Sequence, residues 1–557
     1  MVRGKRSYRN GLTAVKCFLV LSIAAFMTRI LPLSMSQYPF NNDSLTECEF
    51  ALNILNSGHL GLPSGEPWYG THGGSTPILH VLLAFTSSTL GVSPFQCAQF
   101  LDAIVAVLTI GCLFLLGRFV SGSLRGGVAA SFAAILMGTF VFTTGSVWDE
   151  MLGISFLAFA LLAFVLRKHP AFRVLVFSVL MLMPLVDRLV AIVALLAFAY
   201  LVAWSWFFRL STGAPKRRYL EDLVTVAVPI IWAVIFYASV EPSQVSGVSF
   251  GVKMMLLGAS FVLISIVAVL ILSIQNHFRR TLAPIVAVGL FAIITLDYMG
   301  YLFSYTPSVS DVYFLLAASS AFLFGLAWYG AEVILETRPS YRAIQVALIV
   351  SPLSVMGFGM LNGFSLPSHQ IVYRTFDFID IFIILGLGVA IVWLYNRHRK
   401  AYHIVGFLTI VCLLVSFPFA YESEGLLGVR HDTQGYEIDS AAWISEHADS
   451  PLLFSDERLG YIAESTYGLP RYASLPSDLK RNVTLSDKIH CLVEDNWVSQ
   501  GVNVFPYGKV KLPENNYTWI LESANVFYIG GPENDRAIMF MISPWGAFVV
   551  YNPGVWQ

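Results

Sequence analysis

Charged residues are scarce in this sequence. Asp, Glu, Lys and Arg make up 12% of the 557 residues, whereas hydrophobic residues make up 56%, and the mean hydropathy is +0.67. A soluble chain of this length needs far more polar surface to face water. The composition therefore excludes an ordinary soluble protein and predicts a polytopic α-helical membrane protein.

An excess of one charge sign and a cysteine framework are also missing. The formal net charge is −1, which gives no basis for binding nucleic acid. The six cysteines form neither a CxxC pair nor a metal-binding spacing. One disulfide is conceivable among the three that could lie outside the membrane, Cys48, Cys97 and Cys491. Internal repeats are not visible, including the inverted repeats of many transporters.

Long apolar runs, by contrast, fill most of the chain. Thirteen of them, of about 15–25 residues, are long enough to count as membrane spans. The predicted spans are 14–34, 97–119, 126–147, 151–167, 172–186, 188–209, 223–240, 252–274, 282–303, 311–335, 343–361, 377–395 and 403–420.

Basic residues occur in alternate connections between these spans. One set of connections is rich in Arg and Lys, for example 118–125 and 397–400, and the other set has almost none. The positive-inside rule places the rich set in the cytoplasm. A cytoplasmic N-terminus and an odd number of crossings then put the tail outside, so we expect a multi-pass protein of the plasma membrane or of an equivalent of the endoplasmic reticulum.

The chain divides near residue 421. Residues 1–421 hold the predicted spans, and residues 38–96 form a first outer loop within that part. Residues 422–557 have ordinary polar content and short strand-like runs, so we predict a small α+β domain outside the membrane.

The first outer loop contains two short helix patterns. Ser44 and Glu47 fit a capping box that opens an amphipathic helix ending at Gly58, with Asp43 at its start. The second helix begins at Thr76-Pro77 and ends near Gly91. Neither is long enough to cross a bilayer.

Aromatic and histidine residues surround the second helix pattern. Trp68, Tyr69 and His72 precede it and His80 lies within it. They form a candidate substrate loop. We interpret the two histidines as interfacial polar residues, because a metal site needs convergent ligands.

Three further groups of ionisable residues share the predicted outer face, which is otherwise poor in charge. They are Asp149-Glu150, Asp187-Arg188 and Arg374. Such residues at membrane depth are costly and are kept mainly when paired or functional. The plainer alternatives are helix capping by Asp43, an Asp187–Arg188 ion pair and a snorkelling Arg374.

The order and spacing of these motifs resemble a known family. The matching stretches are Asn42-Asp43-Ser44, 51–58, His72 to His80, 90–94, 98–102 and 113–118, followed by Asp149-Glu150. Over about residues 15–210 the chain resembles the GT-C superfamily of integral-membrane glycosyltransferases. Within it, the protein-O-mannosyltransferase and aminoarabinose-transferase-like branch (glycosyltransferase family 39-like) is the most similar.

The resemblance implies a GT-C fold and a catalytic acid at Asp43. The family usually has a second acid beside the first, but here Ser44 follows, with Glu47 one turn on. Asp149 and Glu150 match the second acidic motif. A WWDYG-like motif is absent, which argues against transfer of whole glycans to asparagine.

The expected activity is transfer of a single sugar from a dolichyl- or undecaprenyl-phosphate donor to a glycan, protein or lipid acceptor at the outer face. In an inverting reaction Asp43 would act as the base. Arg374 first, and Arg188 second, would bind the donor phosphate. No cofactor is required, although a divalent metal bridging Asp43 and Asp149 stays open. A flippase of lipid-linked saccharides and a non-catalytic scaffold are the alternatives.

Overall fold

The computed structural model describes most of the membrane part and pieces of the tail. The described residues are 2–34, 38–60, 77–212, 216–240, 248–274, 276–298, 313–362, 366–421, 432–447, 453–469, 471–472, 490–494, 497, 502–504, 508–510, 528–530 and 537–539.

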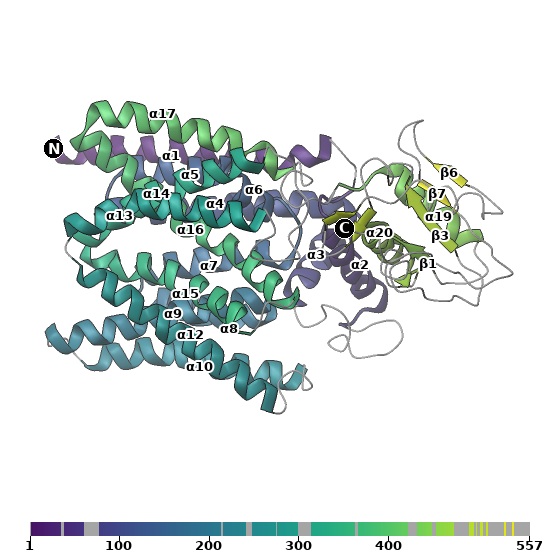
Figure 1. Ribbon diagram of the computed structural model, residues 1–557, viewed down its shortest axis with the longest axis horizontal. Coiled ribbons are helices and arrows are strands. Elements are labelled where there is room, and N and C mark those ends of the chain that lie inside the picture. The colour runs from purple at the N-terminus through teal and green to yellow at the C-terminus, as the bar shows by residue number, and fades with distance from the viewer. Residues whose placement is uncertain are drawn as a thin grey trace.

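Long helices pack side by side into one bundle, and α2, α3 and the tail lie together beyond one end of it (Figure 1). The bundle helices are α1 (Val2–Ile30), α4 (Pro94–Ser121), α5 (Leu124–Leu136), α6 (Gly138–Thr144), α7 (Asp149–Val165), α8 (Pro170–Leu182), α9 (Arg188–Thr212), α10 (Lys216–Val240), α12 (Val248–Ser273), α13 (Asn276–Tyr298), α14 (Tyr313–Thr337), α15 (Arg342–Leu361), α16 (Leu366–Arg397) and α17 (Arg399–Ser416). Short 3-10 turns occupy Leu31–Ser34, Met183–Leu185, Pro339–Tyr341 and Pro418–Ala420.

Within the described residues, nine helices are long and apolar enough to cross a membrane, or ten if α5 and α6 count as one bent span. This agrees with a polytopic membrane protein, but the predicted number of thirteen is not confirmed. Two of the predicted spans correspond to α7 and α8, whose lengths are 17 and 13 residues. Hydropathy alone does not reveal where an apolar run stops being helical.

The predicted span 126–147 is not one continuous helix. The structure breaks it at Met137, and α5 and α6 meet at 73°. The buried Arg29 of α1 donates hydrogen bonds to the carbonyls of Ala134 and Ile135, at 2.9 and 3.1 Å. Carbonyls at a helix end need such partners in a medium without water. The guanidinium also donates to Thr144 at 2.8 Å, so it joins both halves of the break.

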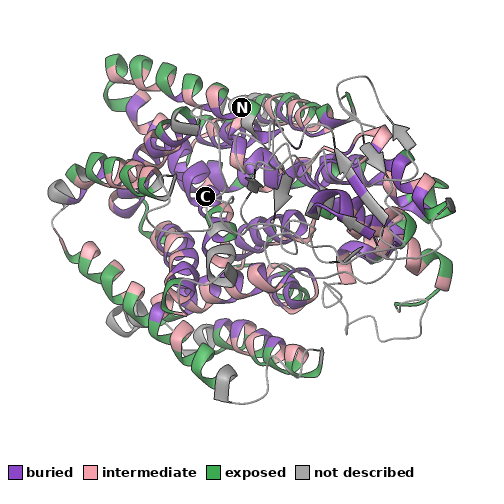
Figure 2. Cartoon of the chain, turned by 45° about the vertical axis from the view of Figure 1, so that its right-hand side comes forward, coloured by how far each residue is buried: buried purple, intermediate pink, exposed green. Residues whose placement is uncertain are grey.

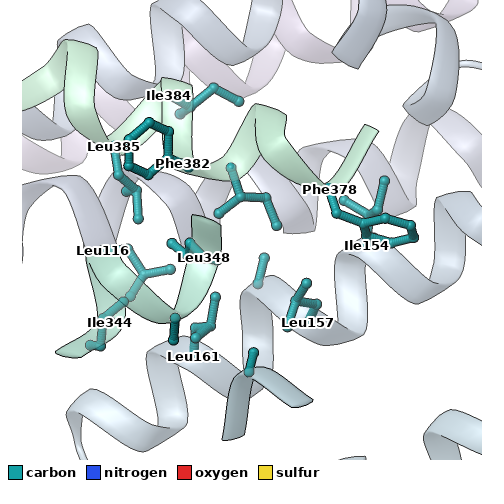
Figure 3. Close-up of a cluster of buried hydrophobic side chains, with 14 of the residues drawn as sticks. Leu116, Ile154, Leu157, Leu161, Ile344, Leu348, Phe378, Phe382, Ile384 and Leu385 are labelled. Atoms are coloured by element: carbon teal, nitrogen blue, oxygen red, sulfur yellow. The ribbon is translucent and has the colours of Figure 1, made fainter. Parts of the chain in front are cut away.

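Buried aliphatic and aromatic side chains hold the bundle together. Figure 3 shows one such cluster, in which residues of α4, α7, α15 and α16 interdigitate, among them Leu116, Leu157, Leu348 and Phe382. Buried residues gather inside the bundle and exposed ones along its outer helices (Figure 2). Exposed apolar residues of α12, such as Leu263 at 58%, suit contact with lipid rather than water.

The described part of the tail contains two helices and short strands. They are α19 (Gly435–His447), α20 (Glu457–Tyr467), β1 (Leu453–Ser455), β2 (Arg471–Tyr472), β3 (His490–Glu494), β4 (Val502–Val504), β5 (Gly508–Val510), β6 (Tyr528–Gly530) and β7 (Ala537–Met539). One sheet has the order β2-β1-β3-β7-β6, with β1 parallel to β2 and β3 and the other pairs antiparallel, and β4 pairs with β5. A separate domain spanning 422–557 stays a prediction.

The tail contacts the first outer loop. Helix α20 packs on α2 (Asn42–Ser57), and the hydroxyls of Thr46 and Ser465 are 2.9 Å apart. These two segments, far apart in sequence, therefore lie at the same end of the bundle.

Candidate active site

The first turn of α2 carries Asp43. The helix begins at Asn42, and its N-cap is Asn41, whose side chain accepts a hydrogen bond from the backbone N–H of Asp43 at 3.2 Å. The predicted capping box is wrong, because the Ser44 hydroxyl donates to the Phe40 carbonyl instead. Asp43 is exposed, and a carboxylate in a first turn is stabilised by the helix dipole. The predicted end of this helix at Gly58 is confirmed, with φ of 72°.

Glu47 faces inward from α2 and pairs with His80 of α3 (Pro77–Leu90). The His80 side chain is only 1% exposed. His80 is therefore buried between the two surface helices rather than placed at an interface as predicted. Cys48 and Cys97, which the sequence left open as disulfide partners, are buried free thiols in the same region.

Asp149, at the start of α7, approaches this pair. One carboxylate oxygen each from Glu47 and Asp149 and one ring nitrogen of His80 all lie within 4.8 Å of one another. Carboxylate oxygen and imidazole nitrogen are common ligands of divalent metals. The group that could hold a metal thus contains the predicted Asp149, but Glu47 and His80 take the place expected for Asp43.

Burial and neighbouring charges shift the pKa values of this group. Burial raises the pKa of Glu47 to about 8, the negative charges of Asp43 and Asp187 raise it further, and Arg374 lowers it. Burial also lowers the pKa of His80, which the charge of Asp149 opposes. Of these residues, His80 of α3 and Asp149 of α7 are the ones whose side-chain atoms lie within 4.8 Å of the Glu47 carboxylate.

Glu150 and Arg374 form an ion pair between α7 and α16. The glutamate side chain is 3% exposed, whereas the arginine side chain is 46% exposed. The buried carboxylate therefore holds one side of the guanidinium and leaves the rest accessible.

Sequence reasoning assigned no site role to two acids that follow Arg374 on α16, Asp377 and Asp380. Asp380 accepts a hydrogen bond from the Thr139 hydroxyl at 2.8 Å, and Asp377 lies three residues before it on α16. Thr139 belongs to α6, so this bond fastens the short helix after the break to α16. The sequence signal for Asp380 is its spacing of three residues from Asp377 at the start of an apolar run, which puts both on one helix face.

Asp187 acts as a helix cap. Its carboxylate accepts a hydrogen bond from the Val190 N–H at 2.6 Å, at the start of α9. Burial raises the pKa of Asp187, and the Arg188 charge opposes this. The Arg188 guanidinium lies 5.9 Å from the ring centre of Tyr237. The predicted Trp68, Tyr69 and His72 lie outside the described residues.

Most of the predicted site residues thus meet at one end of the bundle, which we call the site end and define by Asp43, Glu47, His80, Glu150 and Arg374.

Comparison with solved structures identifies the architecture. The chain superposes on the crystal structure of the oligosaccharyltransferase of Archaeoglobus fulgidus in complex with Zn and sulfate with a TM-score of 0.54 and 13% identity, covering 94% of this chain and 72% of that one. The same enzyme tethered to an acceptor peptide containing the NVT sequon gives 0.54 and 13% over 96% and 74%. The chain has the GT-C fold.

The GT-C resemblance of the sequence is therefore confirmed for the fold. ArnT from Cupriavidus metallidurans also matches, with a TM-score of 0.40 and 14% identity over 97% of this chain and 99% of that one. No protein-family model matches the sequence, and no curated protein matches it either.

Proposed function

We propose that this GT-C protein is a membrane glycosyltransferase that moves a single sugar from a polyprenyl-phosphate donor to a glycan, protein or lipid acceptor. The observation that carries the proposal is that an exposed carboxylate, Asp43, and a half-exposed guanidinium, Arg374, both lie at the site end. Their charges both act on Glu47. Sugar transfer from a lipid phosphate needs these two groups.

Asp43 is the proposed base. It is exposed at the start of α2, where an acceptor hydroxyl can approach, and it accepts the proton as that hydroxyl attacks the sugar from the side opposite the leaving phosphate.

Arg374 is the proposed phosphate-binding residue. A guanidinium offers several donors in a plane and binds phosphate oxygens in pairs. Glu150 holds one side of it, which fixes its orientation before the donor arrives. Positive charge at this position stabilises the negative charge that grows on the leaving phosphate. Arg188 is a second candidate for the same role.

A divalent cation fits the group formed by Glu47, His80 and Asp149 in ligand type and spacing. Bound there, it would supply positive charge near the phosphate. The proposed residues Asp43 and Arg374 act on acceptor and donor without being ligands in this group.

We further propose that the first outer loop (38–96) and the tail (422–557) face the outside and that the N-terminus is cytoplasmic. The contact between α2 and α20 supports one side for loop and tail. Cysteine labelling of intact vesicles tests this proposal. Labelling at residue 59 from inside and at residue 400 from outside would reverse it.

The decisive experiment compares Asp43→Asn with Glu49→Gln, a matched change on the same helix. With purified protein, polyprenyl-phosphate sugar and a membrane extract as acceptor, Asp43→Asn should lower transfer by about 10²–10⁴-fold, as expected for a lost base. Glu49→Gln should retain transfer. Equal rates for Asp43→Asn and wild type would remove Asp43 from the mechanism. Lipid translocation without transfer in vesicles would favour a flippase.

A further inference from the structure

A groove opens at the end of the bundle away from the site end. Its volume is about 430 Å³, within the range of about 300–1,000 Å³ for small-molecule sites. It lies between α1, α5, α16 and α17, and its lining includes Arg125, Phe132, Tyr395, Tyr402 and Ile410. We call this end of the bundle the basic end, defined by Ser121, Arg125, Arg338 and Tyr395.

Polar donors gather at one side of this groove. The Arg125 guanidinium lies 3.8 Å from the centre of the Tyr395 ring, and the rings of Tyr395 and Tyr402 are 5.2 Å apart, edge to face. The Arg399 guanidinium lies 5.9 Å from the Tyr395 ring centre. Guanidinium and phenol hydroxyl groups both donate to phosphate oxygens.

The rest of the lining is apolar and partly open. Phe132 is 38% and Ile410 is 44% exposed, and aliphatic residues such as Leu387 and Val392 complete the groove. In a chain with a membrane-spanning bundle, such a surface contacts hydrocarbon rather than water.

The charge around the groove is of one sign. Arg125 is the charged residue in its lining, and the adjoining segments 118–125 and 397–400 carry Arg or Lys at five positions and contain no Asp or Glu. Basic pockets between membrane helices favour anionic over zwitterionic headgroups.

The groove lies far from the proposed donor phosphate. Arg374 and Tyr395 lie on the same helix, α16, and 21 residues at 1.5 Å each separate them by about 31 Å. An occupant at the basic end therefore belongs to the opposite leaflet from the proposed donor.

We propose that this groove binds one anionic phospholipid, with its phosphate at Arg125 and Tyr402 and an acyl chain between α5 and α17. This inference does not depend on the proposed transferase activity, because the groove and the site end share no lining residue.

Native mass spectrometry of the full-length protein tests the proposal. Purified protein is incubated with equal amounts of phosphatidylglycerol and phosphatidylcholine, and the lipid that stays bound is identified by its mass. We expect one phosphatidylglycerol to be retained in preference. Arg125→Gln should reduce its retention about tenfold, as for one lost charge-assisted contact. Arg118→Gln, a change of the same charge at the same end outside the groove, should not.

A second variant blocks the groove without removing charge. Gly406 lines it, and a Cβ built there meets no atom within 4 Å, so Gly406→Leu should fold and fill the space. Gly258→Leu on α12, equally open, is the control. Loss of phosphatidylglycerol only in Gly406→Leu supports the proposal. Equal retention of both lipids by wild type would overturn it, and so would unchanged retention in both groove variants. Displacement of the bound phosphatidylglycerol by added polyprenyl phosphate, but not by other lipids, would also overturn it.

Discussion

Two of the arginine–glutamate pairs that join bundle helices in the described part of the chain differ in how far they are exposed. At the site end, Glu150 is 3% exposed and Arg374 is 46% exposed. Toward the basic end, Arg279 of α13 and Glu332 of α14 are 6% and 2% exposed, and their side chains are 2.9 Å apart. One pair is half open, and the other is closed.

The difference indicates two uses of the same chemistry. The closed pair satisfies its own charges, and Arg279 also donates to the Leu272 carbonyl at the end of α12, so it fixes three helices. In the open pair the guanidinium keeps donors on its accessible side. Only such an arginine can bind an incoming phosphate without first breaking an ion pair.

The largest effect on stability should come from the closed pair. Arg279→Met leaves the Glu332 carboxylate buried without its partner, and we expect a loss of about 3–5 kcal/mol. Thermal unfolding in detergent measures it. The double variant Arg279→Met with Glu332→Leu should recover most of the loss, because no charge is left buried. A single variant as stable as wild type would show that water reaches this pair.

The open pair should respond mainly in activity. Arg374→Gln is expected to lower transfer by about 10²–10³-fold, as for one lost oxyanion-stabilising donor, and Arg374→Lys should restore part of it. Glu150→Gln combined with Arg374→Gln removes the unpaired acid and controls for stability. If the double variant regained transfer, Arg374 would have a structural role only.

The site end should also bind a metal through its additional ligands. We expect one divalent ion, tested with Mn²⁺ and Zn²⁺ by titration calorimetry, and a decrease in affinity of at least about tenfold in His80→Ala. Glu49→Gln on α2, which is not one of the three ligands of the group, serves as the control. Identical titration curves for His80→Ala and wild type would exclude this group as ligands.

The smallest effect is expected where the tail meets the loop. Ser465→Ala removes the hydroxyl that lies 2.9 Å from Thr46, and one such hydrogen bond contributes about 0.5–1.5 kcal/mol. Limited proteolysis of the tail should become slightly faster, with transfer nearly unchanged. Thr466→Ala, whose hydroxyl bonds only within its own helix to Ile462, is a suitable comparison.

Local signals in the sequence were sufficient for the surface helices. Pro77 starts α3, and Gly58 and Gly91 adopt positive φ just after α2 and α3. These helix ends could be predicted because each depends on only one or two residues. The polar residues of the outer face were also recognised, since charge in an apolar chain is conspicuous.

Tertiary contacts determined what the sequence did not reveal. Glu47 and His80 are 33 residues apart, and their pairing requires α2 and α3 to pack together. The break at Met137 depends on Arg29, which is more than 100 residues away, so no local pattern marks it. The predicted number of thirteen spans stays unconfirmed, because an apolar run does not fix the length of the helix that it forms.

Asn41 has a consequence for sequence variation. It is the one non-glycine residue with positive φ in the described part of the chain, at 79°, and its side chain also caps the helix that carries Asp43. Glycine reaches this backbone, with φ of 79° and ψ of 131°, without strain, whereas a side chain is held there only at a cost. Natural homologues should therefore carry asparagine or glycine at this position, including those that have another residue at the position of Asp43.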